Sequence, residues 1–344
     1  MKLISFVIPC YRSEKTIELV VKEIIDTVKA KGEEFDYEII AVNDYSPDNV
    51  YEVLQKLAAE NQRIKVINFA KNMGKHSAVL AGYSIAKGEY IVDLDDDYQC
   101  PTYELWKLIE PLENDDCDVA IAKYKVKKES FIKRVGSRVN RKMTDVLLNK
   151  PRDIQFENFS VRKRFVCEEM VKYKNPYPFL EGLTLRVTHR IITVQMEQRN
   201  RADDNTTGFT FRKSFSLLLN GLTAFSVKPL QVATFVGSTV AMAGFLWGIG
   251  VIIKRLLNPY VTMGYSSLLA VLLFLGGLNM IMLGLVGEYV GRIYISINDS
   301  PQYVIKNTLN VEKGEECKNG QGNEYQREIT PETGGGQDKR NELA

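Results

Sequence analysis

The sequence of 344 residues has little net charge and few side chains of the kinds that bind transition metals. Its formal charge is +2, and it has no zinc pattern or sheet motif of nucleic-acid binders, so no nucleic-acid partner is expected. It contains two histidines and five cysteines, and no two cysteines have CxxC spacing. An odd set of widely spaced cysteines is typical of reduced thiols in a domain that faces the cytosol.

The sequence also lacks the glycine patterns of dinucleotide-binding domains and of P-loops, so a dehydrogenase loses its main support. What it has is an alternation of strand-like and helix-like segments. Strands are predicted at residues 3–8, 37–42 and 63–69, from Tyr90 to the acidic residues that follow it, and at 118–122 and 193–198. Helices are predicted at 17–28, 49–61 and 76–86. This order predicts a parallel sheet covered by helices, with ligands beyond the carboxyl ends of the strands.

An acidic cluster follows the fourth predicted strand. It has four carboxylates within five positions, Asp93, Asp95, Asp96 and Asp97. Like charges this close raise one another's pKa, and a bound cation relieves the repulsion. Asp95 and Asp97 can direct oxygens at one Mg²⁺ or Mn²⁺ ion, which would take further ligands from water and substrate phosphates. The cluster therefore predicts a metal–diphosphate site, and an exposed acidic turn is the alternative.

Four stretches in order carry a resemblance to a known family. They are residues 7–11, residues 42–48, the spaced set Asn72, Gly74, Ala78 and Gly82, and residues 95–99 with Pro101. Together they make residues 3–228 resemble a family-2 glycosyltransferase. The most similar subgroup is the polyprenyl-phosphate sugar transferases, which are similar to dolichol-phosphate-mannose synthase. The resemblance implies an α/β fold of GT-A (Rossmann-like) type, a mostly parallel sheet with helices on both faces, and a Mg²⁺ or Mn²⁺ cofactor.

The resemblance also implies roles for individual residues. Those expected to bind the nucleotide are Pro9, Tyr11, Asp44, Lys75, Asp95 and Asp96. Those expected to contact the diphosphate or the acceptor are Gln99, Arg134, Ser137 and Thr206. Catalytic roles fall to Asp97, Lys123 and Arg201, with Asp97 and Asp95 as metal ligands and Arg199 as the competitor of Arg201. Tyr11 as a packing residue and Asn72 as part of a simple turn remain open.

The sequence departs from the family pattern at three places. Arg12 stands where asparagine is usual, and Tyr45 replaces a small or acidic residue. The family's Gly-Phe pair is missing from the acceptor-side segment, residues 153–160. These departures leave the sugar and the base of the donor undecided, with a UDP-sugar preferred over a GDP-sugar.

The composition changes abruptly after Lys228. Residues 232–253 and 265–287 carry no charge, and each stretch is long enough to cross about 30 Å of hydrocarbon. The expected division is a catalytic domain at 1–208, an interfacial amphipathic helix at 209–228, two transmembrane helices within 229–295 and a cytoplasmic, largely disordered tail at 296–344. The expected location is the cell (inner or plasma) membrane, multi-pass, with a cytoplasmic catalytic domain. GxxxG patterns at Gly244 and Gly287 allow a homo-oligomer, either a dimer or a tetramer.

The two predicted transmembrane helices, joined by the short polar segment 254–264, would form a helical hairpin, and this hairpin indicates the acceptor. A polysaccharide synthase would need more helices and a QxxRW motif, and a transferase with a soluble acceptor would need no anchor. A polyprenyl phosphate lies at the bilayer surface, and its phosphate (second pKa about 6) is already ionised at neutral pH, so no general base is required. The sequence thus predicts inverting sugar transfer to polyprenyl (undecaprenyl) phosphate, for cell-envelope glycan biosynthesis or modification. Two alternatives stay open: transfer to a glycerolipid hydroxyl, with Glu181 or Asp153 as base, and a degenerate, non-catalytic nucleotide-binding membrane protein.

Overall fold

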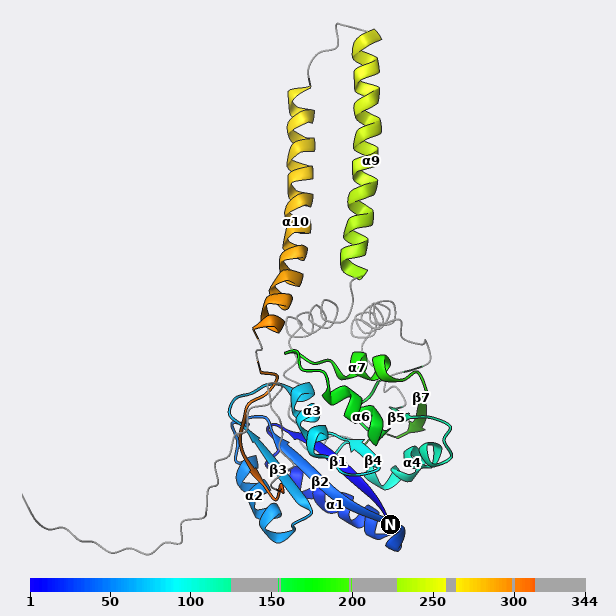
Figure 1. The fold of residues 1–344 in the computed structure, drawn as a ribbon, viewed down its shortest axis with the longest axis vertical. Coiled ribbons are helices and arrows are strands. Elements are labelled where there is room, and N and C mark those ends of the chain that lie inside the picture. The colour runs from blue at the N-terminus through cyan, green and yellow to red at the C-terminus, as the bar shows by residue number, and fades with distance from the viewer. Residues whose placement is uncertain are drawn as a thin grey trace, which may run out of the picture.

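The fold is built on one eight-stranded sheet with the strand order β7-β5-β6-β4-β1-β2-β3-β8 (Figure 1). The computed structural model describes residues 1–124, 154, 156–197, 199, 228–257, 264–298 and 301–312. The strands are β1 Lys2–Cys10, β2 Phe35–Asn43, β3 Ile64–Phe69, β4 Tyr90–Asp93, β5 Val119–Tyr124, β6 Ser160–Lys163, β7 Ile191–Met196 and β8 Ile305–Leu309. Within these residues, β6 and β8 pair antiparallel with their neighbours and the other pairings are parallel. The predicted mostly parallel sheet is confirmed.

Helices cover both faces of the sheet (Figure 1). On one face lie α1 Ile17–Lys29, α2 Val50–Glu60 and α4 Trp106–Glu113; on the other lie α3 Lys75–Ile85, α6 Arg164–Val171 and α7 Leu180–Val187. Short 3-10 turns occur at η1 Gly32–Glu34 and η2 Thr102–Glu104. Side chains of β1 alternate between the layers, since Phe6 and Ile8 join the first core and Val7 the second. Apolar residues at nearly every position of the central strands follow from this burial on two sides.

Two glycines of the spaced set explain how α3 meets the sheet. A Cβ on Gly82 would lie 2.3 Å from Val7 Cγ1, so glycine is needed for α3 to pack this closely on β1. Gly74 has φ +85°, a backbone conformation that side chains disfavour, and it precedes the first residue of α3. This geometry brings Lys75 to the side of the sheet where the parallel strands β1 to β4 have their carboxyl ends, called the carboxyl edge below.

A strand within residues 296–344 was not anticipated, because the polar composition of this stretch predicted a largely disordered tail. β8 pairs antiparallel with the edge strand β3. The segment that contains it, residues 301–312, is called the return segment below. The Tyr303 ring stacks on Phe69 with 5.5 Å between centroids, and Asn310 Nδ2 donates to the carbonyls of Ala58 and Ile64 at 2.7 and 2.9 Å. These contacts fix the return segment to the sheet.

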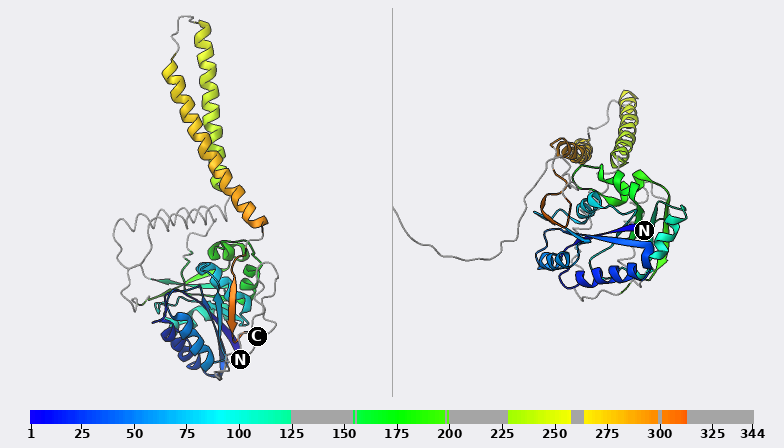
Figure 2. Two further views of the ribbon diagram at one scale, coloured as in Figure 1. Left: turned by 90° about the vertical axis from the view of Figure 1, so that its left-hand side faces the viewer. Right: turned by 60° about the horizontal axis from the view of Figure 1, so that its bottom comes forward.

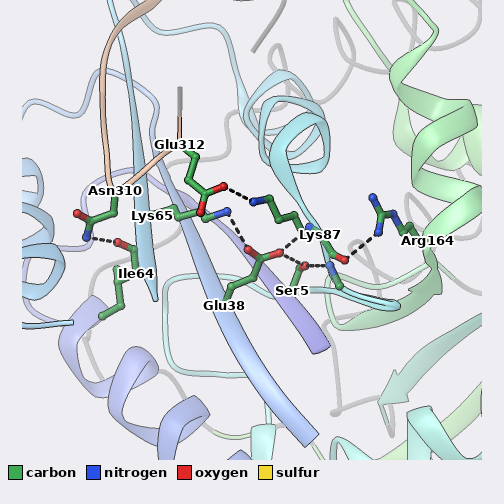
Figure 3. A network of polar contacts seen from close by, with 9 residues as sticks. Ser5, Glu38, Ile64, Lys65, Lys87, Arg164, Asn310 and Glu312 are labelled. Carbon is green, nitrogen blue, oxygen red and sulfur yellow. Dashed lines mark hydrogen bonds and ion pairs between the residues drawn. The ribbon is translucent and has the colours of Figure 1, made fainter. Parts of the chain in front are cut away.

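A polar network joins the return segment to the amino ends of the central strands (Figure 3). Lys65 on β3 and Glu38 on β2 form a buried ion pair of 3.0 Å. The Lys87 backbone N–H donates to Glu38 at 2.6 Å, and Lys87 Nζ pairs with Glu312 at 2.8 Å. Because its buried members are hydrogen-bonded, this network fixes the end of the sheet opposite the carboxyl edge.

Two long helices, α9 Lys228–Leu257 and α10 Tyr265–Ile297, extend from the sheet domain as a pair (Figures 1 and 2). Both contain a window long and apolar enough to cross a membrane by length and composition. Their apolar side chains are exposed: Trp247 is 78% and Leu257 81% accessible. Such surface is unfavourable in water and matches a lipid environment. Both helices extend beyond the predicted spans, and the predicted interfacial helix lies outside the described residues except for Lys228.

Candidate active site

Three loops meet at the carboxyl edge of the sheet, after β1, β2 and β4. The Tyr11 backbone N–H donates to Asp96 Oδ2 at 2.8 Å, and Thr16 Oγ1 donates to the Asp96 carbonyl at 2.6 Å. The Arg12 N–H donates to Ser46 Oγ at 2.7 Å. Residues far apart in sequence are thus joined at the edge where ligands bind in parallel α/β sheets.

Asp44 holds the loop before α3. Its Oδ1 accepts the Met73 N–H at 2.6 Å and its Oδ2 accepts the Gly74 N–H at 2.9 Å. Asn72 Nδ2 donates to the Asp44 carbonyl at 3.0 Å. Burial raises the pKa of the Asp44 carboxyl, and the two N–H donors oppose this effect. Asn72 is therefore part of the hydrogen-bonded contact between Asp44 and the loop before α3. Each carboxylate oxygen of Asp44 keeps a second lone pair that can accept a hydrogen bond from a ligand.

The carboxylates of the acidic cluster contact different neighbours. Asp95 pairs with Lys75 and accepts a hydrogen bond from Asn158. Asp97 Oδ1 accepts the Gln99 N–H at 3.2 Å. Asp96 is directed toward the β1 loop, and burial raises the pKa of Asp96 to about 6. Lys75 and Asp95 are thus brought together as expected, while Asn158 is a contact that the sequence argument missed.

Asp93 lies apart from the other three acids. It is buried, ion-paired with Arg162 on β6, and accepts hydrogen bonds from Tyr83 at 2.7 Å and Ser160 at 3.2 Å. Burial raises the pKa of Tyr83 well above its ordinary value. The idea that four carboxylates crowd together is therefore wrong for Asp93, because it is the last residue of β4 and is buried within the sheet, whereas the other three follow in the loop beyond the strand.

The remaining predicted residues divide into those on the edge and those outside the described residues. Pro9 is the second-last residue of β1 and lies beside Val42 of β2. Tyr11 is the first residue after β1, and 45% of its surface is exposed. Lys123 is half-buried near the end of β5, which runs parallel to β4 and so ends at the same edge. The predicted residues outside the described ones are Arg134, Ser137, Arg201 and Thr206.

Arg199 has a different role from the one considered for it. Its guanidinium forms a bidentate pair with Glu23 of α1, at 2.6 and 2.8 Å. The same group lies 4.8 Å from the ring centroids of both Tyr98 and Tyr103. Its backbone N–H donates to the Gln99 carbonyl at 3.3 Å. Arg199 thus anchors the chain after β7 to the loop of residues 94–101 that follows β4, called the acidic loop below. Arg201 remains the predicted phosphate ligand.

A double-mutant cycle tests this anchor. Glu23→Gln and Arg199→Met, made singly and together, are expected to couple by about 1–2 kcal/mol in unfolding free energy, because the pair is bidentate and largely covered. Denaturant unfolding of the full chain measures the coupling. The exposed pair Lys172–Glu169 is the matched control and should couple by about 0.5 kcal/mol or less. Equal coupling in the two pairs would contradict the anchor.

Neither histidine is placed to act as a general base at this edge. Burial lowers the pKa of His76 to about 4, so the ring is neutral near pH 7. His76 Nδ1 accepts the Leu180 N–H at 3.5 Å, and the ring meets Phe179 edge-on. His189 precedes β7 and so lies toward the opposite edge of the sheet.

The acidic loop suits a hard cation that a substrate helps to hold. The described residues contain no group of three or more histidine, cysteine or acidic side chains that could enclose a metal. Asp95 and Asp97 offer two carboxylates at the strand end. Mg²⁺ commonly binds through one or two carboxylates and completes its shell with water and substrate phosphates. The donor set therefore fits Mg²⁺ or Mn²⁺ when a phosphate ligand is present.

Comparison with protein families gives two matches along the chain. Residues 5–171 match the family described as Glycosyl transferase family 2, and residues 228–293 match the GtrB C-terminal hairpin. The first match covers the sheet domain from β1 to α6, and the second covers most of the helical pair. Both parts of the structure thus have counterparts in described families.

Curated relatives match nearly the whole chain. The uncharacterized glycosyltransferase YkcC of Bacillus subtilis is 30% identical, covering 90% of this chain and 94% of its own. The prophage bactoprenol glucosyl transferase homolog of Escherichia coli is 30% identical, with 88% and 98% covered. An undecaprenyl-phosphate 4-deoxy-4-formamido-L-arabinose transferase of Proteus mirabilis is 28% identical, with 90% and 95% covered. Among solved structures, glucosyl-3-phosphoglycerate synthase of Mycobacterium tuberculosis with Mn²⁺ and UDP-glucose has a TM-score of 0.46 at 16% identity, covering 64% of this chain and 77% of the synthase.

Proposed function

Because this chain belongs to glycosyl transferase family 2, we propose that it transfers a sugar from a nucleotide-diphosphate sugar to polyprenyl phosphate at a membrane surface. The observation that carries the proposal is the match over 88% and 90% of the chain, sheet domain and hairpin together, to relatives named as bactoprenol and undecaprenyl-phosphate sugar transferases. The fold is of the GT-A class, as the resemblance implied. The site agrees with this chemistry, since its loops present carboxylates and Lys75 at one edge.

The donor is proposed to bind across the loops after β1, β2 and β4. Pro9, Tyr11 and Asp44 would hold the nucleoside, and Lys75 and Asp96 would fix the loops around it. Asp95 and Asp97 would hold Mg²⁺ or Mn²⁺, which supplies positive charge next to the leaving diphosphate. We prefer a UDP-sugar to a GDP-sugar, and an assembly of two or four copies stays a prediction.

The transfer is proposed to be one inverting displacement. An oxygen of the lipid phosphate attacks the anomeric carbon, and the bond from that carbon to the diphosphate oxygen breaks. Gln99, in the acidic loop, would lie beside the diphosphate. Lys123 at the end of β5 and Arg201 in the loop after Arg199 would stabilise the negative charge. Ionised phosphate needs no proton acceptor, which agrees with a neutral His76 already engaged by Leu180.

The membrane arrangement follows from the same proposal. Two spans that form a hairpin leave the domain and the return segment on one side. Nucleotide-sugars are cytosolic metabolites, so that side is proposed to be the cytoplasm. Each span would cross the cell membrane, which makes the chain a multi-pass protein. Ser296 Oγ near the end of α10 donates to Asn175 Oδ1 at 2.7 Å, so the domain is joined to the hairpin close to the bilayer surface.

Transfer by the full chain in lipid vesicles tests the function. With Mn²⁺ and radiolabelled UDP-sugars or GDP-sugars, label is expected in undecaprenyl phosphate and nucleoside diphosphate is expected to be released. Vesicles with diacylglycerol in place of undecaprenyl phosphate are the matched control and should remain unlabelled. Label in diacylglycerol would show a glycerolipid acceptor instead. Nucleotide binding without transfer to either lipid would show a non-catalytic protein.

A further inference from the structure

Two exposed residues on neighbouring loops have a backbone conformation that their side chains disfavour. Arg12, after β1, has φ 60°, and Tyr45, after β2, has φ 51°. This left-handed region suits glycine, asparagine and aspartate, whereas large side chains crowd the backbone there. Unfavourable backbone that persists at a site is a pointer to function, provided that a second observation agrees.

The second observation is that the fold makes little use of either side chain. Tyr45 is 59% exposed, and within the described residues its side chain has no hydrogen bond or ring contact. Arg12 is exposed, and its guanidinium lies 5.5 Å from the Tyr11 ring centroid without an ion pair in the described part of the chain. Tyr45 therefore offsets none of the backbone cost through contacts inside the domain, and Arg12 offsets it only through its contact with the Tyr11 ring, which is itself exposed.

The third observation is that the spacing of the two loops is fixed. Ser46 Oγ accepts the Arg12 N–H at 2.7 Å, and the Ser46 N–H donates to Asn43 Oδ1 at 3.2 Å. Tyr45 directly follows Asp44, whose carboxylate holds the loop before α3. A phenol ring and a planar guanidinium are thus held at the edge where the donor site is proposed.

We propose that Tyr45 and Arg12 are specificity-determining contacts for the nucleoside half of the donor. The Tyr45 ring packs on the face of the nucleobase, because aromatic rings stack on bases of any sequence. The Arg12 guanidinium donates hydrogen bonds to carbonyl oxygens on the base, and it has only donors to offer. Uracil with its two carbonyl groups suits that donor set. This inference rests on the proposed function.

The experiment separates a binding role from a structural one through two opposite effects. Tyr45→Asn and Arg12→Asn introduce a residue that tolerates the left-handed conformation, so each is expected to raise the Tm of the ligand-free full chain by about 2 °C. Each is also expected to weaken UDP binding about tenfold in titration calorimetry with Mn²⁺. Arg12→Asn should weaken the binding of GDP less than the binding of UDP.

Two control variants make the test specific. Tyr45→Phe keeps the ring and should bind UDP as the unmodified chain does. Tyr177 is also exposed, at 62%, with φ 61°, but it lies in the loop before α7, so Tyr177→Asn should raise the Tm without changing UDP affinity. Unchanged UDP affinity in Tyr45→Asn and Arg12→Asn, or a lowered Tm, would overturn the inference. An unmodified chain that binds neither UDP nor GDP would refute the proposed function and this inference with it.

Discussion

Replacing Asp97 with asparagine is expected to lower sugar transfer about a thousandfold, because a charge next to the leaving diphosphate is removed. Asparagine has the same shape, and its Oδ1 can still accept the Gln99 N–H that Asp97 accepts at 3.2 Å. The acidic loop should therefore keep its conformation while the charge is lost. Transfer of label to undecaprenyl phosphate at saturating donor measures the change.

The control for Asp97→Asn is Asp26→Asn, a neutralised acid on the exposed face of α1. It should transfer sugar at the rate of the unmodified chain. The Tm of both variants should stay within about 2 °C of the unmodified chain, as for most substitutions outside the core. Transfer by Asp97→Asn at more than a tenth of the unmodified rate would remove Asp97 from the mechanism. Asp95→Asn is less informative, since it also disturbs the contacts of Lys75 and Asn158.

Replacing Arg162 with methionine is expected to destabilise the chain by about 3–5 kcal/mol, the largest loss of stability we expect from one substitution. Arg162 and Asp93 are 4% and 7% exposed, so the substitution leaves a carboxylate without its counter-charge inside the domain. Tyr83 and Ser160 donate to that carboxylate but carry no charge. Denaturant unfolding of the full chain measures the loss.

A second substitution identifies the cause of that loss. Asp93→Asn combined with Arg162→Met removes both charges, and the Tyr83 and Ser160 hydroxyls can still donate to the amide oxygen. The double variant should therefore recover most of the lost stability. Arg164→Met, two residues along, removes an exposed arginine that pairs with Glu168 and donates to the Lys87 carbonyl, and it should cost about 1 kcal/mol or less. If the losses of stability measured for Asp93→Asn and Arg162→Met alone simply add in the double variant, the uncompensated charge is not the cause.

The sheet could be predicted because its central strands are short apolar runs separated by helical periodicity. β6 and β8 escaped prediction because Ser160–Lys163 and Ile305–Leu309 are short and largely polar. Their places in the sheet come from long-range pairing, with β4 and β5 for the one and with β3 for the other. Local patterns contain no information on such partners, whereas buried parallel strands are marked by composition alone.

The candidate site could be predicted where its residues follow strands directly. Asp44 meets the Asn72–Gly74 loop, and Lys75 meets Asp95, because carboxyl ends of parallel strands share one edge. The direction of each side chain could not be predicted: Asp93 faces the core and Asp96 the β1 loop. The pairing of Arg199 with Glu23 joins residues 176 positions apart, which no local signal indicates.

The return segment means that the hairpin interrupts the domain instead of following it. The chain leaves the sheet after β7 and supplies the outer strand β8 only once α10 has ended (Figures 1 and 2). Truncation before α9 would strip that strand and leave the long edge of β3 open to association with other molecules. A water-soluble enzyme is better engineered by excising α9 and α10 and splicing the return segment back through a flexible linker.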